Sequence, residues 1–223
     1  MKAENYTWWK KRFHKLYSMV DIVRIDHFRG FESYWEVDGK AKNAIQGRWL
    51  PGPGKPFFDE VRRALGSLPI VAEDLGIITP EVEKLRDDCG FPGMKVLEFT
   101  LYLNHQHRLS TVVPENSIVY TGTHDNNTIV GWLKDERKAI ADLVRADVRK
   151  PEEIARHLIG FAYASNARLA VIPMQDLLQL DGSARMNTPG TSDGNWKWCM
   201  RPGDLEKVDA AKLHALAVRT GRA

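Results

Sequence analysis

The sequence predicts an α/β fold in which helices cover a parallel β-sheet. Short apolar segments rich in Val, Ile and Leu recur along the chain, and amphipathic segments at helical spacing lie between them. Each predicted strand is a continuous apolar run, which is typical of parallel sheets that are buried on both faces. With 223 residues, 43% of them hydrophobic, the chain is long enough to build the core of one domain.

The helices and strands follow one another in a regular order. Residues 6–18 predict an amphipathic helix whose basic side chains form a solvated face. Thr79 is expected to cap a helix that has Pro80 at its first position. Further helical sequence is expected around residues 58–65 and from residue 126 to about residue 167. The predicted strands are residues 20–26, 69–75, 94–99, 117–122 and 169–173.

Two longer segments are predicted to be irregular. Residues 39–55, which include GRWLPGPGK, are polar and interrupted by Gly and Pro, and such loops often lie beside a functional site. The tail after residue 180 is expected to be irregular cover for the same domain. Within it, residues 194–204 (GNWKWCMRPGD) predict a loop folded over the sheet.

Composition narrows the class of protein. The 32 basic and 29 acidic side chains leave a formal charge of +3, which gives no argument for a nucleic-acid partner. Cys89 and Cys199 lie far apart without the spacing of a zinc site, so we expect a reduced, cytoplasmic setting. We expect neither a signal peptide nor a membrane span, because no apolar window is long enough.

Ionisable residues follow three of the predicted strands. They are Arg24 to His27, Glu73 with Asp74, and His124 with Asp125. Side chains at the carboxyl ends of parallel strands share one edge, where α/β proteins build their sites. Each group alone could be structural, but several acids at one edge are electrostatically costly unless chemistry needs them.

Glycoside chemistry would use such carboxylates, because it needs one acid as the nucleophile and a second as the acid/base. Arg24 and Asp26 lie two residues apart on one strand, so Arg24 can keep Asp26 ionised. His27 and Asp74 are interpreted as structural hydrogen-bonding groups, and Lys95 with Glu98 as a local pair. A metal site built from His27, His124 and the acids is disfavoured, because Asp26 and His27 would face opposite sides of a strand.

Five motifs together resemble one known family. They are RIDHFRGF, GRWLPGPGKPFFD, VAEDLG, GTHDNNT, and MNTPG with GNWKW, and they run through essentially the whole chain. The chain thus resembles the 4-α-glucanotransferases, also called amylomaltases or disproportionating enzymes, of glycoside hydrolase family 77. The resemblance implies that Asp26 is the nucleophile, Glu73 the general acid/base and Asp125 the transition-state stabiliser. The substrate-binding residues that it implies are Arg24, His124, Asn195 and Phe99.

The same resemblance implies a fold, a reaction and partners. Residues 1–223 would form the C-terminal part, about strands 4 to 8, of a (β/α)8 TIM-type barrel, with the N-terminal strands absent. The reaction would move 4-α-glucan segments between malto-oligosaccharides or other α-1,4-glucans, without a cofactor and without a nucleic-acid or membrane partner. Open barrel edges could also allow self-association. The aromatic side chains expected to stack on acceptor sugars are Trp35, Trp49, Phe57, Trp196 and Trp198.

Two alternatives stay open from the sequence. One is an inactive, truncated remnant of the enzyme. The other is a half-barrel that binds glucans without acting on them. Cys199, which follows GNWKW where the family pattern has an arginine, leaves the contribution of the last loop open.

Overall fold

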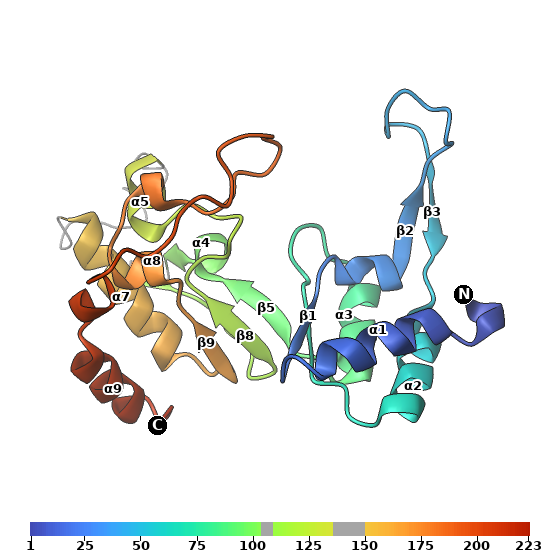
Figure 1. The fold of residues 1–223 in the computed structure, drawn as a ribbon, viewed down its shortest axis with the longest axis horizontal. Coiled ribbons are helices and arrows are strands. Elements are labelled where there is room, and N and C mark those ends of the chain that lie inside the picture. Colours follow the sequence, from blue (N-terminus) through green and yellow to red (C-terminus); the bar gives the residue numbers. More distant parts are fainter. Residues whose placement is uncertain (104–108, 136–149) are drawn as a thin grey trace. The chain divides into compact units, whose positions relative to one another are not determined.

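The structure is a computed structural model that describes residues 1–103, 109–135 and 150–223. The chain divides into two compact units, Met1–Met94 and Lys95–Ala223 (Figure 1). Both units combine helices with strands, so the predicted α/β class is confirmed.

Unit 1 places a pair of parallel strands among three α-helices. β1 pairs with β4 in the register Val23↔Ile70 and Ile25↔Ala72, as the predicted parallel sheet requires. Its elements are η1 (Lys2–Glu4), α1 (Thr7–Tyr17), β1 (Val23–Ile25), η2 (Phe28–Phe31), β2 (Ser33–Glu36), β3 (Arg48–Pro51), α2 (Gly54–Leu65), β4 (Ile70–Ala72) and α3 (Pro80–Cys89).

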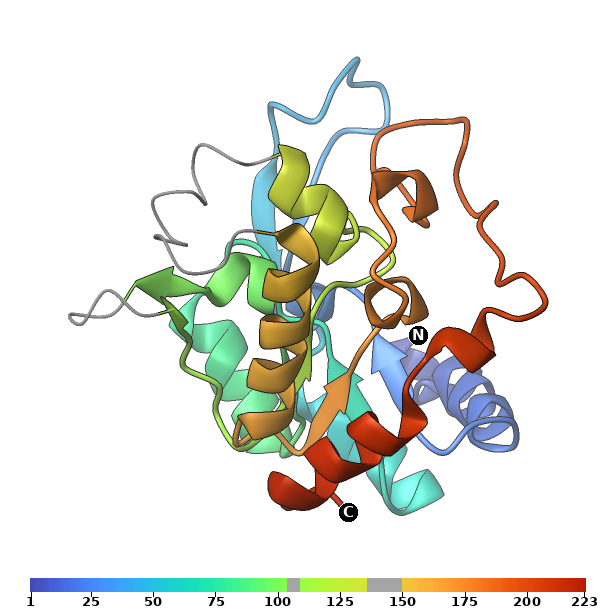
Figure 2. The same ribbon diagram turned by 90° about the vertical axis from the view of Figure 1, so that its left-hand side faces the viewer.

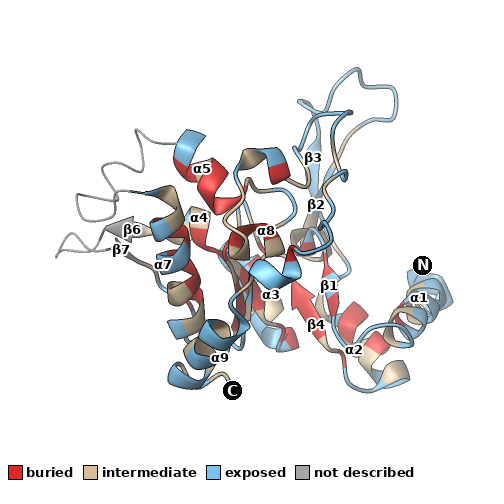
Figure 3. Cartoon of the chain, turned by 60° about the vertical axis from the view of Figure 1, so that its left-hand side comes forward, coloured by how far each residue is buried: buried red, intermediate tan, exposed pale blue. Residues whose placement is uncertain are grey.

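The core of unit 1 contains a cluster of aromatic side chains. Phe28, Phe57, Phe58 and Phe91 are almost fully buried, and ring pairs such as Phe28 with Phe58, 5.7 Å apart, connect them. β1 and β4 lie in this core, and Figure 3 shows the buried residues along both strands in red. Since burying one aromatic side chain stabilises a fold by about 1.5–3 kcal/mol, this cluster holds the two strand ends in place.

The structure corrects the predicted irregular loop at residues 39–55. β2 and β3 form an antiparallel hairpin in which Trp35 faces Trp49 across the strands, and α2 already begins at Gly54. The prediction missed the hairpin because it is mostly exposed (Figure 3) and has no continuous apolar run. Its strands are recognisable only by cross-strand aromatic pairing, which a single segment does not reveal.

Unit 2 is arranged around a three-stranded sheet in the order β5-β8-β9. β8 and β9 are parallel, with Ile118 opposite Leu169, and α7 packs against both α5 and β9 (Figure 2). The chain passes from unit 1 to unit 2 within β5 (Gly93–Val96). The elements that follow are α4 (Leu97–Thr100), β6 (Tyr102–Leu103), β7 (Leu109–Ser110), β8 (Ser117–Tyr120), α5 (Ile129–Asp135), α7 (Pro151–Ala164), β9 (Leu169–Val171), α8 (Met174–Leu177), η3 (Gly182–Ala184), η4 (Leu205–Lys207) and α9 (Ala210–Arg219).

Three further predictions need correction or lie partly outside the described residues. The strand predicted at residues 94–99 ends at Val96, and the chain turns at once into α4. The tail after residue 180 is irregular only as far as α9, which is capped by Asp209 accepting from the Lys212 N–H. Of the helix predicted from residue 126 to about 167, α5 and α7 are confirmed, whereas residues 136–149 lie outside the described residues.

Not one helix in the described ranges has the length and apolar character needed to cross a bilayer.

Candidate functional site

The carboxyl ends of β1 and β4 bring Asp26 and Glu73 next to each other within unit 1. Both residues directly follow the paired positions Ile25 and Ala72. The ladder continues past the strands, because the Glu73 N–H donates to the Ile25 carbonyl at 2.9 Å. Neighbouring parallel strands lie about 4.8 Å apart, so the two carboxylates start from adjacent backbone positions at one edge.

Asp26 is held by the residue two positions before it. Arg24 Nη1 lies 2.7 Å from Asp26 Oδ1, and the Asp26 side chain is 78% exposed. The Arg24 Nε–H also points at the Met94 sulfur, 3.3 Å away. The predicted pair is therefore confirmed, and it presents an accessible carboxylate whose orientation is set by a guanidinium on the same strand.

Glu73 is oriented by the main chain. Its Oε2 accepts from the His27 N–H at 2.7 Å, and its Oε1 accepts from the Leu75 N–H at 2.9 Å. His27 adopts a left-handed backbone conformation with φ of 50°. The predicted structural role of His27 is confirmed for its backbone, since it is the N–H of this residue that contacts Glu73.

Asp74 is structural, as predicted. It is buried, its Oδ1 accepts from the Met94 N–H at 2.7 Å, and its Oδ2 pairs with Arg86 Nη1 at 2.5 Å. The residue thus joins β4, α3 and β5, and it fixes the backbone that directly follows Glu73.

Asp125 lies in the turn after β8, in unit 2. Asn187 Nδ2 donates to Asp125 Oδ1 at 2.6 Å, and Arg185 donates to the Asp125 carbonyl at 2.7 Å. His124 Nε2 lies 3.3 Å from Asp125 Oδ2, and the Trp196 ring packs against His124 with centroids 5.3 Å apart. Sequence reasoning identified Asp125 and His124 but missed Arg185 and Asn187, whose signal was the nearby MNTPG motif.

The two remaining predicted residues lie in unit 2 without contacting Asp125 through a described hydrogen bond. Asn195 Oδ1 accepts from the Thr188 N–H at 2.8 Å and its Nδ2 donates to the Thr191 carbonyl, so its amide organises its own loop. Phe99 lies on α4 and is 65% exposed. Their roles toward a substrate stay predictions.

Glu98 is a functional candidate that sequence reasoning did not select. In the described part of the chain no ion pair joins it to Lys95, so the predicted local pair is wrong. Instead Glu98 Oε2 accepts from Asn126 Nδ2 at 3.0 Å. Burial raises the pKa of Glu98 to about 8, although the Asn126 bond acts in the opposite direction. The signal was not available in the sequence, because it depends on the burial that α4 imposes.

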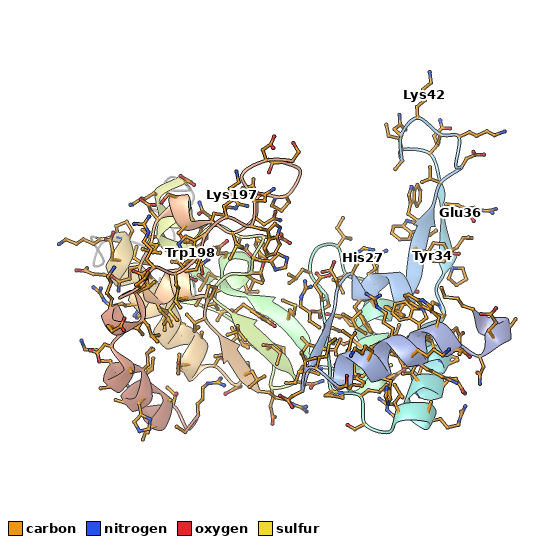
Figure 4. The ribbon with its side chains drawn as sticks, viewed as in Figure 1. His27, Tyr34, Glu36, Lys42, Lys197 and Trp198 are labelled. Atoms are coloured by element: carbon orange, nitrogen blue, oxygen red, sulfur yellow. The ribbon has the colours of Figure 1, made fainter. Side chains whose placement is uncertain are left out.

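The aromatic side chains divide into exposed and buried ones. Trp35 and Trp49 are 38% and 52% exposed with ring centroids 5.4 Å apart, and Arg29 lies over Trp49 at 4.4 Å. Figure 4 shows Tyr34 and Glu36 on the same hairpin and Lys42 at its tip. Phe57 is only 1% exposed, so the prediction that it stacks on sugars is wrong: it belongs to the core.

Among residues 1–103, 109–135 and 150–223, no group of three or more His, Cys, Asp or Glu side chains could hold a metal ion. The acids of the candidate site are carboxylates held by arginine, amide and backbone donors.

Comparisons with known proteins agree with one another. A family model described as 4-alpha-glucanotransferase matches residues 1–205. The 4-alpha-glucanotransferase of Thermus thermophilus is 42% identical, with 100% of this chain and 46% of that protein covered. The enzyme of the same name from Synechocystis sp. is 48% identical, with 100% and 45% covered.

A solved structure gives the same result. An amylomaltase from Streptococcus agalactiae in complex with acarbose superposes with a TM-score of 0.86 at 37% identity, over 100% of this chain and 46% of that chain. The chain spans about half the length of the relatives that it matches.

Proposed function

Because the chain belongs to the 4-alpha-glucanotransferase family, we propose that it serves the transfer of α-1,4-glucan segments to a glucose or glucan acceptor. The observation that carries the proposal is the placement of Asp26 and Glu73 at the adjoining ends of two paired parallel strands. Retaining enzymes use carboxyl groups about 5 Å apart, whereas inverting enzymes need roughly 6.5–9.5 Å. Adjacent strand positions favour the retaining arrangement.

The proposed reaction proceeds by double displacement. Asp26 attacks the anomeric carbon as Glu73 gives its proton to the departing glucan, which leaves a covalent glycosyl ester on Asp26. The 4-hydroxyl of an acceptor then passes its proton to Glu73 and displaces Asp26, so that the configuration is retained. Both steps use carboxyl groups and sugar hydroxyls, and neither needs a cofactor.

The supporting residues have roles that follow from their contacts. Arg24 orients Asp26 and balances its negative charge, because the guanidinium Nη1 lies 2.7 Å from the Asp26 carboxylate. Asp125, oriented by Asn187 and flanked by His124, would accept hydrogen bonds from sugar hydroxyls in the transition state. Asn195 and Phe99 are proposed as substrate-binding residues on the family resemblance.

We further propose that residues 1–223 correspond to the C-terminal part, about strands 4 to 8, of a (β/α)8 barrel. The parallel pairs β1-β4 and β8-β9, each strand followed by helices, support this assignment. The coverage of about half of each relative supports a partial barrel, whichever strands it holds. Self-association is proposed on this barrel assignment, because a partial barrel leaves open strand edges.

A cytoplasmic setting is proposed because Cys89 and Cys199 are both free.

The test is a product analysis with maltotriose on the folded chain, checked by circular dichroism. We expect glucose together with oligosaccharides longer than maltotriose, and loss of both in Asp26→Asn. Asp21→Asn, which alters an exposed acid outside the site, is the matched control and should keep the wild-type product pattern. If only glucose and maltose form, without longer products, the activity is hydrolysis and the proposed transfer is wrong. A folded chain that forms no product would favour the inactive remnant or the glucan-binding half-barrel.

A further inference from the structure

A chain of hydrogen bonds in unit 2 connects Glu98 to the turn that carries Asp125. Glu98 Oε2 accepts from Asn126 Nδ2 at 3.0 Å. Asn126 Oδ1 accepts from both the N–H and the hydroxyl of Thr123, at 3.0 and 2.7 Å. The Thr123 hydroxyl oxygen then accepts from the Asp125 N–H at 3.3 Å. The first of these hydrogen bonds joins α4 to the turn after β8, and the others lie within the turn.

We propose that Glu98 is a positioning residue, which fixes the Asp125 turn through Asn126 and Thr123. The inference rests on the proposed function, in which the Asp125 carboxylate binds sugar hydroxyls. Neither oxygen of Glu98 is exposed for a direct role in this proposal: Oε2 accepts from Asn126, and Oε1 is buried and has no hydrogen-bond partner among the residues described. Its action on the reaction is therefore transmitted by the turn.

The environment of Glu98 favours the neutral carboxylic acid. Burial raises its pKa to about 8, the nearby Asp176 acts in the same direction, and Arg185 and the Asn126 bond oppose them. Asp176 is itself buried, and burial raises its pKa too. A neutral acid can accept from Asn126 through its carbonyl oxygen without leaving a charge in a buried site. A glutamine, which has the same shape and a carbonyl oxygen, should replace it.

The turn is held from its other side independently of Glu98. Asn187 Nδ2 contacts the Asp125 carboxylate, and the Asn187 N–H donates to the His124 carbonyl at 3.0 Å. Removing Glu98 should therefore loosen the turn without detaching Asp125. The expected result is a slower reaction on a folded protein, because a displacement of about 1 Å at a reacting group can cost up to roughly 100-fold in rate.

Two variants of nearly equal volume separate positioning from packing. Glu98→Gln keeps an acceptor for Asn126, whereas Glu98→Met fills the space without one. Hydrogen exchange of the Thr123 and Asp125 amides, followed by mass spectrometry, reports the turn directly. Maltotriose transfer reports its effect on kcat and KM. In Glu98→Gln both readouts should match the wild type.

In Glu98→Met, we expect the turn amides to exchange about tenfold faster, and kcat to fall roughly 10- to 100-fold with a smaller change in KM. If Glu98→Met does not fold, Thr123→Val gives the same test, because it removes the hydroxyl link and keeps the side-chain shape. Wild-type exchange in the folded variant would overturn the positioning role. Equal loss in Glu98→Gln would show that the ionised carboxylate is needed, which also overturns the proposal.

The exchange readout does not depend on activity. If the wild-type chain shows no transfer but Glu98→Met loosens the turn, the proposed function fails and the positioning role stands. If transfer is normal and exchange is unchanged in Glu98→Met, the positioning role fails alone.

Discussion

Gly93 lies so close to Asp74 that a β-carbon at position 93 would stand 2.5 Å from Asp74 Oδ2 and 3.0 Å from Arg86 Nη1. Asp74 and Arg86 form a buried ion pair directly behind Glu73. The absence of a side chain at Gly93 is therefore what allows β5 to pack against this pair.

Substituting Gly93 by Ala should lower the free energy of unfolding by about 1–3 kcal/mol, because overpacking at a buried site forces the backbone or the ion pair to shift. Urea denaturation followed by circular dichroism measures the change. Gly160→Ala is the matched control: it lies within α7 and its added β-carbon would meet nothing within 4 Å. That variant should be neutral or more stable by up to about 1 kcal/mol. Equal stabilities of the two variants would contradict the close approach of Gly93 to Asp74 and Arg86.

Glu73→Gln should allow the first displacement and slow the second when the donor is an α-maltosyl fluoride. Fluoride leaves without a proton, but the acceptor hydroxyl still needs a base. Mass spectrometry of proteolytic fragments should find the glycosyl ester on Asp26. The double variant Asp26→Asn, Glu73→Gln is the control and should carry no sugar. An adduct elsewhere on the chain would remove Asp26 from the role of nucleophile.

The stability of the protein should decline between about pH 4.5 and pH 8 through Glu98. Its pKa rises from 4.5 in the unfolded chain to about 8 in the folded one, so across this window the folded state binds more protons than the unfolded state. Raising the pH then favours unfolding. Asp176 contributes with the same sign, because burial raises its pKa as well.

Glu98→Gln should remove the Glu98 part of this decline. Urea denaturation of both proteins at pH 5 and pH 8 measures it, and the variant should gain stability relative to the wild type as the pH rises. Parallel pH profiles would show that Glu98 is ionised at neutral pH in the folded protein.

Trp49→Ala should weaken the binding of maltoheptaose several-fold, since an exposed indole offers a large, rigid apolar face on which a sugar ring can stack. Trp49 is the more exposed member of the Trp35–Trp49 pair, and Arg29 covers one region of its ring. Calorimetry gives the affinity. Trp8→Ala changes another exposed indole, on α1, and should leave the affinity unchanged. The same loss in both variants would point to a nonspecific effect.

Much of unit 1 could be predicted from the sequence, because β1 and β4 are short apolar runs that end in charged residues. That pattern predicted Asp26 and Glu73 at the ends of two parallel strands, and the structure pairs these strands with each other. The spacing of Arg24 and Asp26 also predicted their ion pair. α3 begins at Pro80 with Thr79 in the N-cap position, as predicted, but the predicted side-chain cap is wrong, because the Thr79 side chain makes no capping bond to the backbone.

Other features depend on contacts that no local pattern records. The hairpin depends on the pairing of Trp35 with Trp49 across a loop of exposed residues. α9 was predicted as irregular cover, whereas in the structure it is a helix that packs against α7 without burying any residue completely. The raised pKa of Glu98 follows from burial and from Asp176, which lies far from it in sequence.

The carboxylate of Glu73 receives its hydrogen bonds from the amides of His27 and Leu75, and this has a consequence for engineering. Changing the side chains at these two positions does not remove the backbone N–H donors. A mutational library can therefore vary both positions while the Glu73 carboxylate keeps its hydrogen bonds and its orientation. Proline is the exception, since it has no N–H and cannot adopt the positive φ of position 27. Position 27 should tolerate asparagine and glycine best, because these residues enter the left-handed region most easily. Random mutagenesis can therefore vary the residues next to Glu73 without removing the hydrogen bonds that orient its carboxylate.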